Sequence, residues 1–362
     1  MTAFFQAAFL LSGTVIGAGM FSLPYSFLLS GFWTSLLGLV VLTLLTLSLN
    51  LFYARLILKN SGDHQLCGYM GKYFGSKGRS LGSLAIVLSA TGATLAYVIL
   101  GGNFLSLFFG TVPSLFYRLI FLLVGIIFFV GGIKTISSFG GILSLGLVVL
   151  AIVFSGLGIK YFQFQNLFIP ATDNLAFYGP VLFSLSGAIV IPEVEEILRV
   201  NNKRNKLYKA IVLGTLLPAI VYVVFSFGVL AISGAFTTAD ALSGLIIWSP
   251  LLVRMGAVVG FFSCLTSFYS LANVLKELCL RDFKVGKKLS INLPILIGLT
   301  GVWLNVGLFF KIISLTGTFA VGLIGILIAA MYLKAGAKNW GKAISYMIIA
   351  AFSLGMILQL TH

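Results

Sequence analysis

The chain consists of long apolar runs, each close to the length that crosses a bilayer as a helix, separated by short polar stretches. Of its 362 residues, 59% are hydrophobic and 9% are charged, which lies far outside the range of soluble globular domains. The pattern predicts an all-α integral membrane protein. Its eleven transmembrane helices are expected at about residues 3–30, 32–57, 80–110, 114–133, 136–159, 176–198, 209–232, 250–279, 291–309, 311–333 and 342–360.

Two of these spans contain a pattern that breaks helices. In the first span Gly19 precedes Pro24 by five residues, and in the sixth Gly187 precedes Pro192 by the same distance. Glycine and proline both disfavour a continuous helix, so we expect helices 1 and 6 to be discontinuous near the middle of the membrane. Backbone groups freed there need a substrate, an ion or water as partner, which indicates a transport site. The alternative is that the glycines serve close helix packing and the prolines only kink the helices.

The two breaks also indicate an internal repeat. They lie about half the chain apart, and each opens a block of five spans. Because five is odd, the second block enters the membrane inverted relative to the first. We therefore expect a single transporter domain over residues 1–362, with repeats at 1–160 and 174–333 and an extra eleventh helix at 342–360.

The net charge of +15 reflects membrane topology rather than nucleic-acid binding. If the N-terminus is cytoplasmic, the inner loops hold all but four of the 23 Lys and Arg residues, the exceptions being Arg118, Lys160, Arg254 and Lys311. The positive-inside rule favours this orientation and, with eleven spans, puts the C-terminus outside. We expect a multi-pass protein of the cell's inner (plasma) membrane. Three cysteines imply no disulfide framework, and no obligate protein partner is evident.

The chemistry of the breaks suits a zwitterion. Free amides at a helix start near Ala18 or Gly19 favour a carboxylate, while carbonyls and hydroxyls from Ser184 to Gly187 favour an ammonium group. The first charged side chain beside either break is Glu193. Its place near other charged residues favours a solvated, paired helix end over a proton relay. A small neutral amino acid fits this site.

Two further features are candidates for binding. The hydroxyls of Thr266 and Ser267, with carbonyls freed between Gly13 and Ile16, offer oxygen ligands for a small cation, although such hydroxyls usually bond to their own helix. Tyr97 in the third span would bond either helix backbone or a substrate carboxylate. No catalytic constellation and no cofactor motif occurs, which disfavours an intramembrane enzyme. A channel or uncoupled facilitator shares the topology and remains an alternative.

The motif from Gly13 to Pro24 resembles the first helix of the amino acid/auxin permease and hydroxy/aromatic amino acid permease families of the amino acid-polyamine-organocation superfamily. The segments Phe183–Gly187 with Ile191–Glu193, Tyr97 with its glycines, and Thr266–Phe268 are similar to the sixth, third and eighth helices of those families. The resemblance implies a leucine-transporter (LeuT) type fold and alternating access, in which spans 1, 2, 6 and 7 rock against spans 3, 4, 8 and 9.

The resemblance also implies site residues and ion coupling. Substrate would contact Gly17, Ala18, Gly19, Phe183, Ser184, Ser186 and Gly187. In sodium-coupled relatives the matching ion ligands are carbonyls at Gly13, Ile16 and Ser263 and hydroxyls at Thr266 and Ser267. Some proton-coupled relatives place a lysine in the fifth helix, and this chain has none between Lys134 and Lys160. The expected activity is cotransport of an amino acid with sodium or a proton, and the coupling ion stays open.

Overall fold

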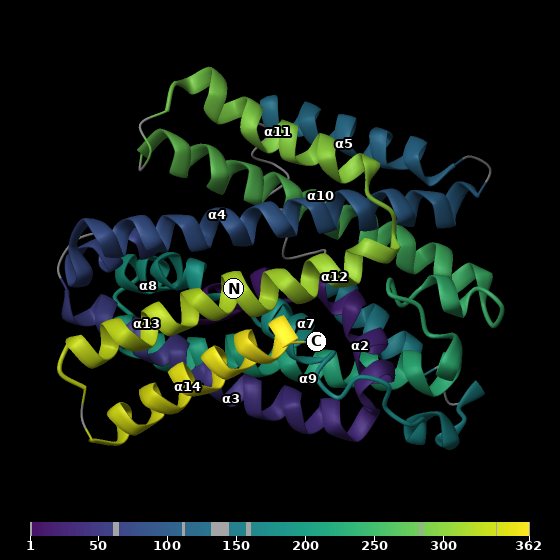
Figure 1. Cartoon of the computed structure of the whole chain (residues 1–362), viewed down its shortest axis with the longest axis horizontal. Helices are drawn as coiled ribbons and strands as arrows, with labels where there is room; N and C mark the ends of the chain where they lie inside the picture. Colours follow the sequence, from purple (N-terminus) through teal and green to yellow (C-terminus); the bar gives the residue numbers. More distant parts are fainter. Residues whose placement is uncertain are drawn as a thin grey trace.

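The computed structural model describes residues 2–60, 65–110, 113–131, 145–156, 161–281, 283, 285–337 and 339–361. Within these ranges all regular structure is helical (Figure 1). Six helices there are long and apolar enough to cross a membrane, and a seventh span results if the bent pair Ala3–Val15 and Ala18–Ser30 is counted as one. The prediction of an all-helical, membrane-type chain is therefore confirmed for the described residues.

One group of helices surrounds the two predicted breaks. α3 and α9 pack against each other, and the short helices of the breaks contact them. Figure 1 shows this group in its lower half. Its members are α1 (Ala3–Val15), η1 (Ala18–Ser22), α2 (Leu23–Ser30), α3 (Phe32–Lys59), α7 (Tyr178–Ser184), η3 (Ala188–Val190), α8 (Ile191–Val200) and α9 (Leu207–Ser233).

A second group packs beside the first. The members α4 (Leu66–Phe109), α5 (Ser114–Val130), α10 (Pro250–Arg281) and α11 (Lys287–Trp303) all contact one another. They form the upper layer of Figure 1, and α4 and α10 run side by side along it. α4 begins well before the expected third span because Gly75, at φ 70°, joins an initial helical segment to the main helix. Of these four helices, α10 contacts η1 at the first break.

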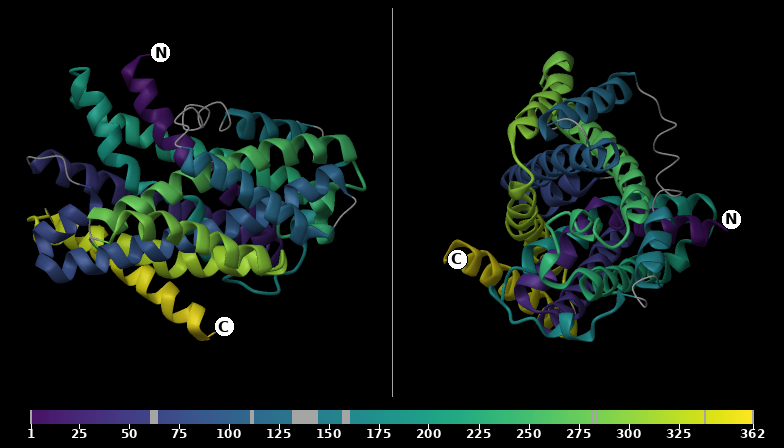
Figure 2. Two further views of the ribbon diagram at one scale, coloured as in Figure 1. Left: turned by 90° about the horizontal axis from the view of Figure 1, so that it is seen from above. Right: turned by 90° about the vertical axis from the view of Figure 1, so that its right-hand side faces the viewer.

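The segment α12 (Gly307–Leu315), η7 (Thr316–Val321) and α13 (Gly322–Lys334) lies between the two groups and contacts both α4 and α7. η7 is a π-helical turn within an otherwise continuous helix. α14 (Asn339–Thr361) packs on α13 at the margin of the molecule (Figure 2). Short 3₁₀ helices connect other elements: η2 (Phe164–Phe168), η4 (Arg204–Lys206), η5 (Gly234–Phe236) and η6 (Ser243–Leu245).

One predicted helix end differs from the structure. The sequence predicted a tight turn near Asn305 to Lys311 and a ninth span that ends at about 309, but α11 ends at Trp303 and α12 begins at Gly307. Asn305 Oδ1 accepts a hydrogen bond from the amide of Leu308 (3.1 Å), which caps the first turn of α12. Of the predicted span 136–159, the helix Leu145–Gly156 is described. The rest of that span, with Lys134 and Lys160, lies outside the described residues.

Candidate functional site

The first break separates α1 from α2. Ile16 (ψ 88°) and Gly17 (φ −132°, ψ −166°) leave the helical conformation after Val15. A single 3₁₀ turn follows, in which the amide of Met20 donates to the carbonyl of Gly17 (3.2 Å). The axes of the two half-helices differ by 41°. The break therefore lies at Ile16–Gly17, next to the residues from which the sequence predicted a carboxylate site.

The second break separates α7 from α8 and has the same construction. Gly187 precedes the short η3, and the amide of Val190 donates to the Gly187 carbonyl (3.3 Å). Pro24 and Pro192 both lie in the first turn of the half-helix that follows their break. A proline there loses no helical hydrogen bond, so the prolines fix the start of α2 and α8 rather than rupture a helix.

The structure brings the two breaks together. A β-carbon built on Gly19 would lie 2.9 Å from Ser184 Oγ and 3.1 Å from the ring of Phe183. A β-carbon on Gly187 would lie 2.6 Å from Val15 and 2.9 Å from Leu11. A β-carbon at either position would force these side chains to shift, so each glycine leaves room for side chains of the other helix. Residues about half the chain apart thus share one location.

Tyr222, on α9, connects the two breaks. Its hydroxyl lies 2.6 Å from the carbonyl oxygen of Val15 and 2.8 Å from that of Ser184. Val15 and Ser184 are the last residues of α1 and α7, whose terminal carbonyls have no helical partner. Tyr222 was not among the residues predicted from the sequence, where the only signal for it is a tyrosine amid an apolar span.

A cavity of about 1420 Å³ adjoins the breaks and contains most of the predicted site residues in its wall. These are Gly13, Ile16, Tyr97, Phe183, Ser186, Gly187, Glu193, Ser263, Thr266 and Ser267. The other four predicted residues lie behind this wall: Ala18, Gly19 and Ser184 are buried, and Gly17 is half-buried. The predicted substrate and cation residues therefore share one region of the molecule.

The hydroxyls of the predicted cation site have partners in the protein. Thr266 Oγ1 donates to the carbonyl of Ser263 (3.0 Å), one turn earlier in α10. Ser267 lies across from the first break, because its Oγ is 3.8 Å from where a β-carbon of Gly17 would be. Among the described residues, no group of three or more His, Cys, Asp or Glu could hold a metal ion. Any cation here would have to be bound by carbonyl and hydroxyl oxygens.

Tyr97 forms part of the cavity wall between the two groups of helices. Its ring meets that of Phe183 edge to face, with centroids 6.5 Å apart. The side chain of Ser267 lies beside the Tyr97 hydroxyl. Tyr97 therefore links the second break to the predicted cation residues.

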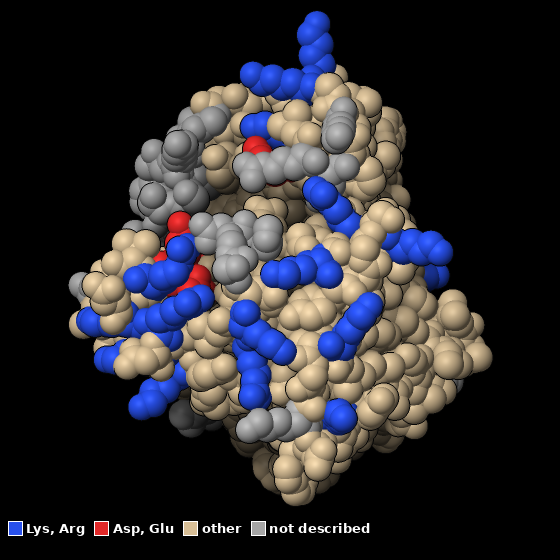
Figure 3. All heavy atoms as spheres, turned by 90° about the vertical axis from the view of Figure 1, so that its left-hand side faces the viewer, with Lys and Arg blue, Asp and Glu red and all other residues tan. Residues whose placement is uncertain are grey.

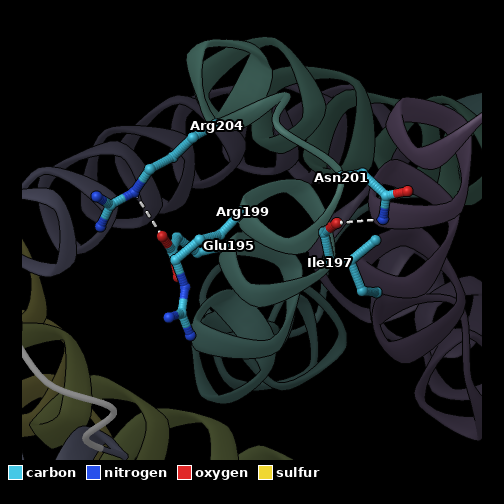
Figure 4. A network of polar contacts seen from close by, with 5 residues as sticks. All are labelled: Glu195, Ile197, Arg199, Asn201 and Arg204. Atoms are coloured by element: carbon cyan, nitrogen blue, oxygen red, sulfur yellow. Dashed lines mark hydrogen bonds and ion pairs between the residues drawn. The ribbon is translucent and has the colours of Figure 1, made fainter.

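Charged residues gather where the cavity reaches the left-hand end of Figure 1. Glu195 is buried and pairs with Arg204 (2.5 Å) and Arg199 (3.4 Å), as Figure 4 shows for Arg204. Glu193, which the sequence singled out as the deepest acid, is instead exposed in the cavity wall. Figure 3 looks onto this end and shows many Lys and Arg side chains, with Asp and Glu beside a hollow.

Comparisons with known proteins give a consistent result. A sequence model of the tryptophan/tyrosine permease family matches residues 1–358. Tyrosine-specific transport system 2 of Haemophilus influenzae is 29% identical over 301 residues, which cover 75% of this chain and 71% of that protein. The fold is similar to that of Mhp1, a nucleobase-cation-symport-1 family transporter solved in a closed conformation with bromovinylhydantoin bound. That likeness has a TM-score of 0.65 at 13% identity, over 98% of this chain and 90% of the other.

Proposed function

Because the chain belongs to the tryptophan/tyrosine permease family, we propose that it is a secondary active transporter that carries an aromatic L-amino acid across the membrane by alternating access. Family membership makes the chain a transporter and not an enzyme. We further propose that transport is coupled to sodium or a proton. We also infer that the chain is a member of the amino acid-polyamine-organocation superfamily and has its leucine-transporter-type inverted repeat.

The contact between the two broken helices carries this proposal. Gly19 lies against Ser184 and Phe183, so that amides at the start of η1 and carbonyls at the end of α7 converge beside the cavity. Opposite partial charges at these helix ends match the carboxylate and the ammonium group of an amino acid. A substrate bound there needs no charged side chain from the protein.

The cavity wall favours an aromatic side chain over the small neutral one that the sequence suggested. Tyr97 and Phe183 lie beside the breaks, and Tyr69 and Tyr269 line the wall further out. Aromatic rings bind one another edge to face with a gain beyond the area that they bury. Phenol and indole side chains are uncharged, so they agree with the absence of acidic or basic groups at the breaks.

Ion coupling would use the oxygen-rich region between α1 and α10. The carbonyls of Gly13, Ile16 and Ser263 and the hydroxyls of Thr266 and Ser267 remain the proposed ligands of a sodium ion. If a proton is used instead, Glu193 is the proposed carrier, an acidic residue of α8 that is exposed in the cavity wall, as is Glu196. Rocking of the group that contains α1, α3, α7 and α9 against α4, α5, α10 and α11 would then expose the site to each side in turn.

Uptake into proteoliposomes tests the proposal. Labelled L-tyrosine, L-tryptophan and L-phenylalanine should accumulate above the outside concentration when a sodium gradient, or a proton gradient, is imposed. Gly19→Leu should abolish uptake because its side chain would collide with Phe183 and Ser184. Gly156→Leu is the matched control, since no atom lies within 4 Å of a β-carbon there and the residue is exposed. Failure to transport any of the three amino acids would contradict the proposal.

The same assay separates the alternative function. An uncoupled facilitator or channel would let substrate equilibrate but not accumulate, and the rate would not respond to either gradient. A response to sodium alone identifies sodium as the coupling ion, and a response to pH alone identifies the proton.

A further inference from the structure

Tyr222 is fully buried within α9, and the wall of the large cavity does not include it. Ser12 Oγ also reaches the Gly214 carbonyl of α9 (3.4 Å), and Gly214 packs against Leu11. α9 therefore packs against α1, and the Tyr222 hydroxyl contacts the breaks at two backbone carbonyls.

The Tyr222 hydroxyl is shared between two backbone carbonyl oxygens. A hydroxyl has one proton, so it cannot give a full hydrogen bond to both Val15 O and Ser184 O at the same time. Each carbonyl oxygen has two lone pairs, so the hydroxyl leaves acceptor capacity on both. Without the hydroxyl, two buried carbonyls at helix ends would have no donor, which is costly inside a protein.

The two carbonyls belong to different parts of the proposed site, one beside the cation ligands and one beside the substrate contacts. Val15 lies between Gly13 and Ile16, the carbonyls proposed for the cation, and Ser184 lies between Phe183 and Ser186, which are proposed for substrate. One side chain thus holds the end of the cation-binding helix and the end of the substrate-binding helix at a fixed separation.

We propose that Tyr222 is a positioning residue that ties the ends of α1 and α7 together and so sets the geometry in which the two breaks bind substrate. The inference rests on the proposed function, because it assumes that an amino acid binds at the breaks. α1, α7 and α9 belong to the same group of helices, so the tie persists while that group moves as a body.

Tyr222→Phe tests the tie, with Tyr53→Phe as the matched control. Tyr53 is also fully buried, and its hydroxyl has no hydrogen-bond partner among the described residues. We expect Tyr222→Phe to raise the KM for uptake of the best aromatic substrate about tenfold or more, as for loss of a hydrogen bond that leaves buried acceptors unsatisfied. Tyr53→Phe should leave KM within about twofold of wild type, because it removes no hydrogen bond that the described residues make.

The KM of the Tyr222→Phe variant distinguishes a positioning role of the hydroxyl from an effect on the stability of the fold. A variant that only folds less well has fewer active molecules, so its maximal rate falls at an unchanged KM. The second measurement is the dissociation constant of the substrate, titrated on purified protein, because it does not depend on the number of folded molecules. It should rise by about the same factor as KM.

Each result has a defined meaning. A Tyr222→Phe KM within twofold of wild type would overturn the inference, whatever the maximal rate does. So would an unchanged dissociation constant for the substrate in purified Tyr222→Phe. If Tyr222→Phe yields no folded protein while Tyr53→Phe does, the hydroxyl serves folding and the inference also fails. Absence of uptake in wild type and in Tyr53→Phe would instead contradict the proposed function.

Discussion

At the scale of single residues, Arg118 shows how a charged side chain is held inside an apolar bundle. It is 4% exposed and lies within α5, although the sequence assigned it to the outer side only from its place near a predicted loop. Its guanidinium donates to the carbonyls of Leu304 and Val302, where α11 ends, and to Ser114 Oγ. The fork of donors on arginine can satisfy several helix-end carbonyls at once.

Arg118→Leu should therefore destabilise the protein. The variant leaves the carbonyls at the end of α11 without their donor, and we expect the apparent melting temperature to fall by about 5 °C. Thermal unfolding can be followed with a thiol-reactive dye, because Cys67, Cys264 and Cys279 are all buried in the fold. Arg254→Leu is the control at an exposed position of α10. An equal melting temperature for Arg118→Leu and wild type would show that the contact contributes nothing.

The residues of the candidate site were predictable where backbone conformation imposes a residue type. Gly19 and Gly187 attracted attention because glycine is unfavourable in a helix, and the structure places both where side chains of the other broken helix approach. Tyr222 was not predictable in this way, since a tyrosine in an apolar span has no pattern that names its partners. Its role depends on the separation of Val15 from Ser184, which only the tertiary structure sets.

At the scale of helices, the contact between α7 and the π-helical turn η7 is the closest approach near the second break. A β-carbon on Gly317 would lie 1.9 Å from the carbonyl oxygen of Gly179, and one on Gly179 would lie 2.2 Å from that of Ser314. Both neighbours are backbone atoms, which cannot rotate away. The segment α12–α13 therefore depends on glycine at both positions to pack against α7.

Gly317→Ala should disrupt this contact. The added methyl group would force α7 and η7 apart, and we expect the apparent melting temperature to fall by about 5 °C or more, with loss of uptake because α7 ends at the second break. The control is Gly286→Ala, at a position with no atom within 4 Å of a β-carbon. Wild-type stability and uptake in Gly317→Ala would mean that the two helices tolerate a larger separation.

Most helices were predictable from apolar run length, whereas their irregularities were not. The sequence located α3, α9 and α14 within a few residues because hydrocarbon thickness fixes the length of a span. It missed the helical segment 66–74 that precedes Gly75 in α4, the π-helical turn at Thr316–Val321 and the boundary at Leu304. Each of these depends on packing or capping by distant residues rather than on local composition.

At the scale of the whole molecule, the distribution of basic residues and the position of the cavity predict one orientation of the protein in the membrane. The cavity reaches the end of the molecule that carries Lys59, Arg199 and Arg204. Thr172 lies at the opposite end of the first group of helices, because its amide donates to the Leu29 carbonyl next to the start of α3. The 28 residues of α3 separate the two ends by about 42 Å, which exceeds the hydrocarbon core of a bilayer.

The positive-inside rule then predicts that the cavity opens toward the cytoplasm. In a background without the three native cysteines, Thr172→Cys should react with a membrane-impermeant maleimide in intact cells, because residue 172 is exposed at the outer end. Asn205→Cys, exposed beside Arg204, should react only after the membrane is opened. Ser270→Cys, in the cavity wall, should follow Asn205→Cys rather than Thr172→Cys, because the cavity joins it to that side. Labelling of Asn205→Cys in intact cells would reverse the orientation, and labelling of Ser270→Cys from the Thr172 side alone would place the cavity opening at the other face.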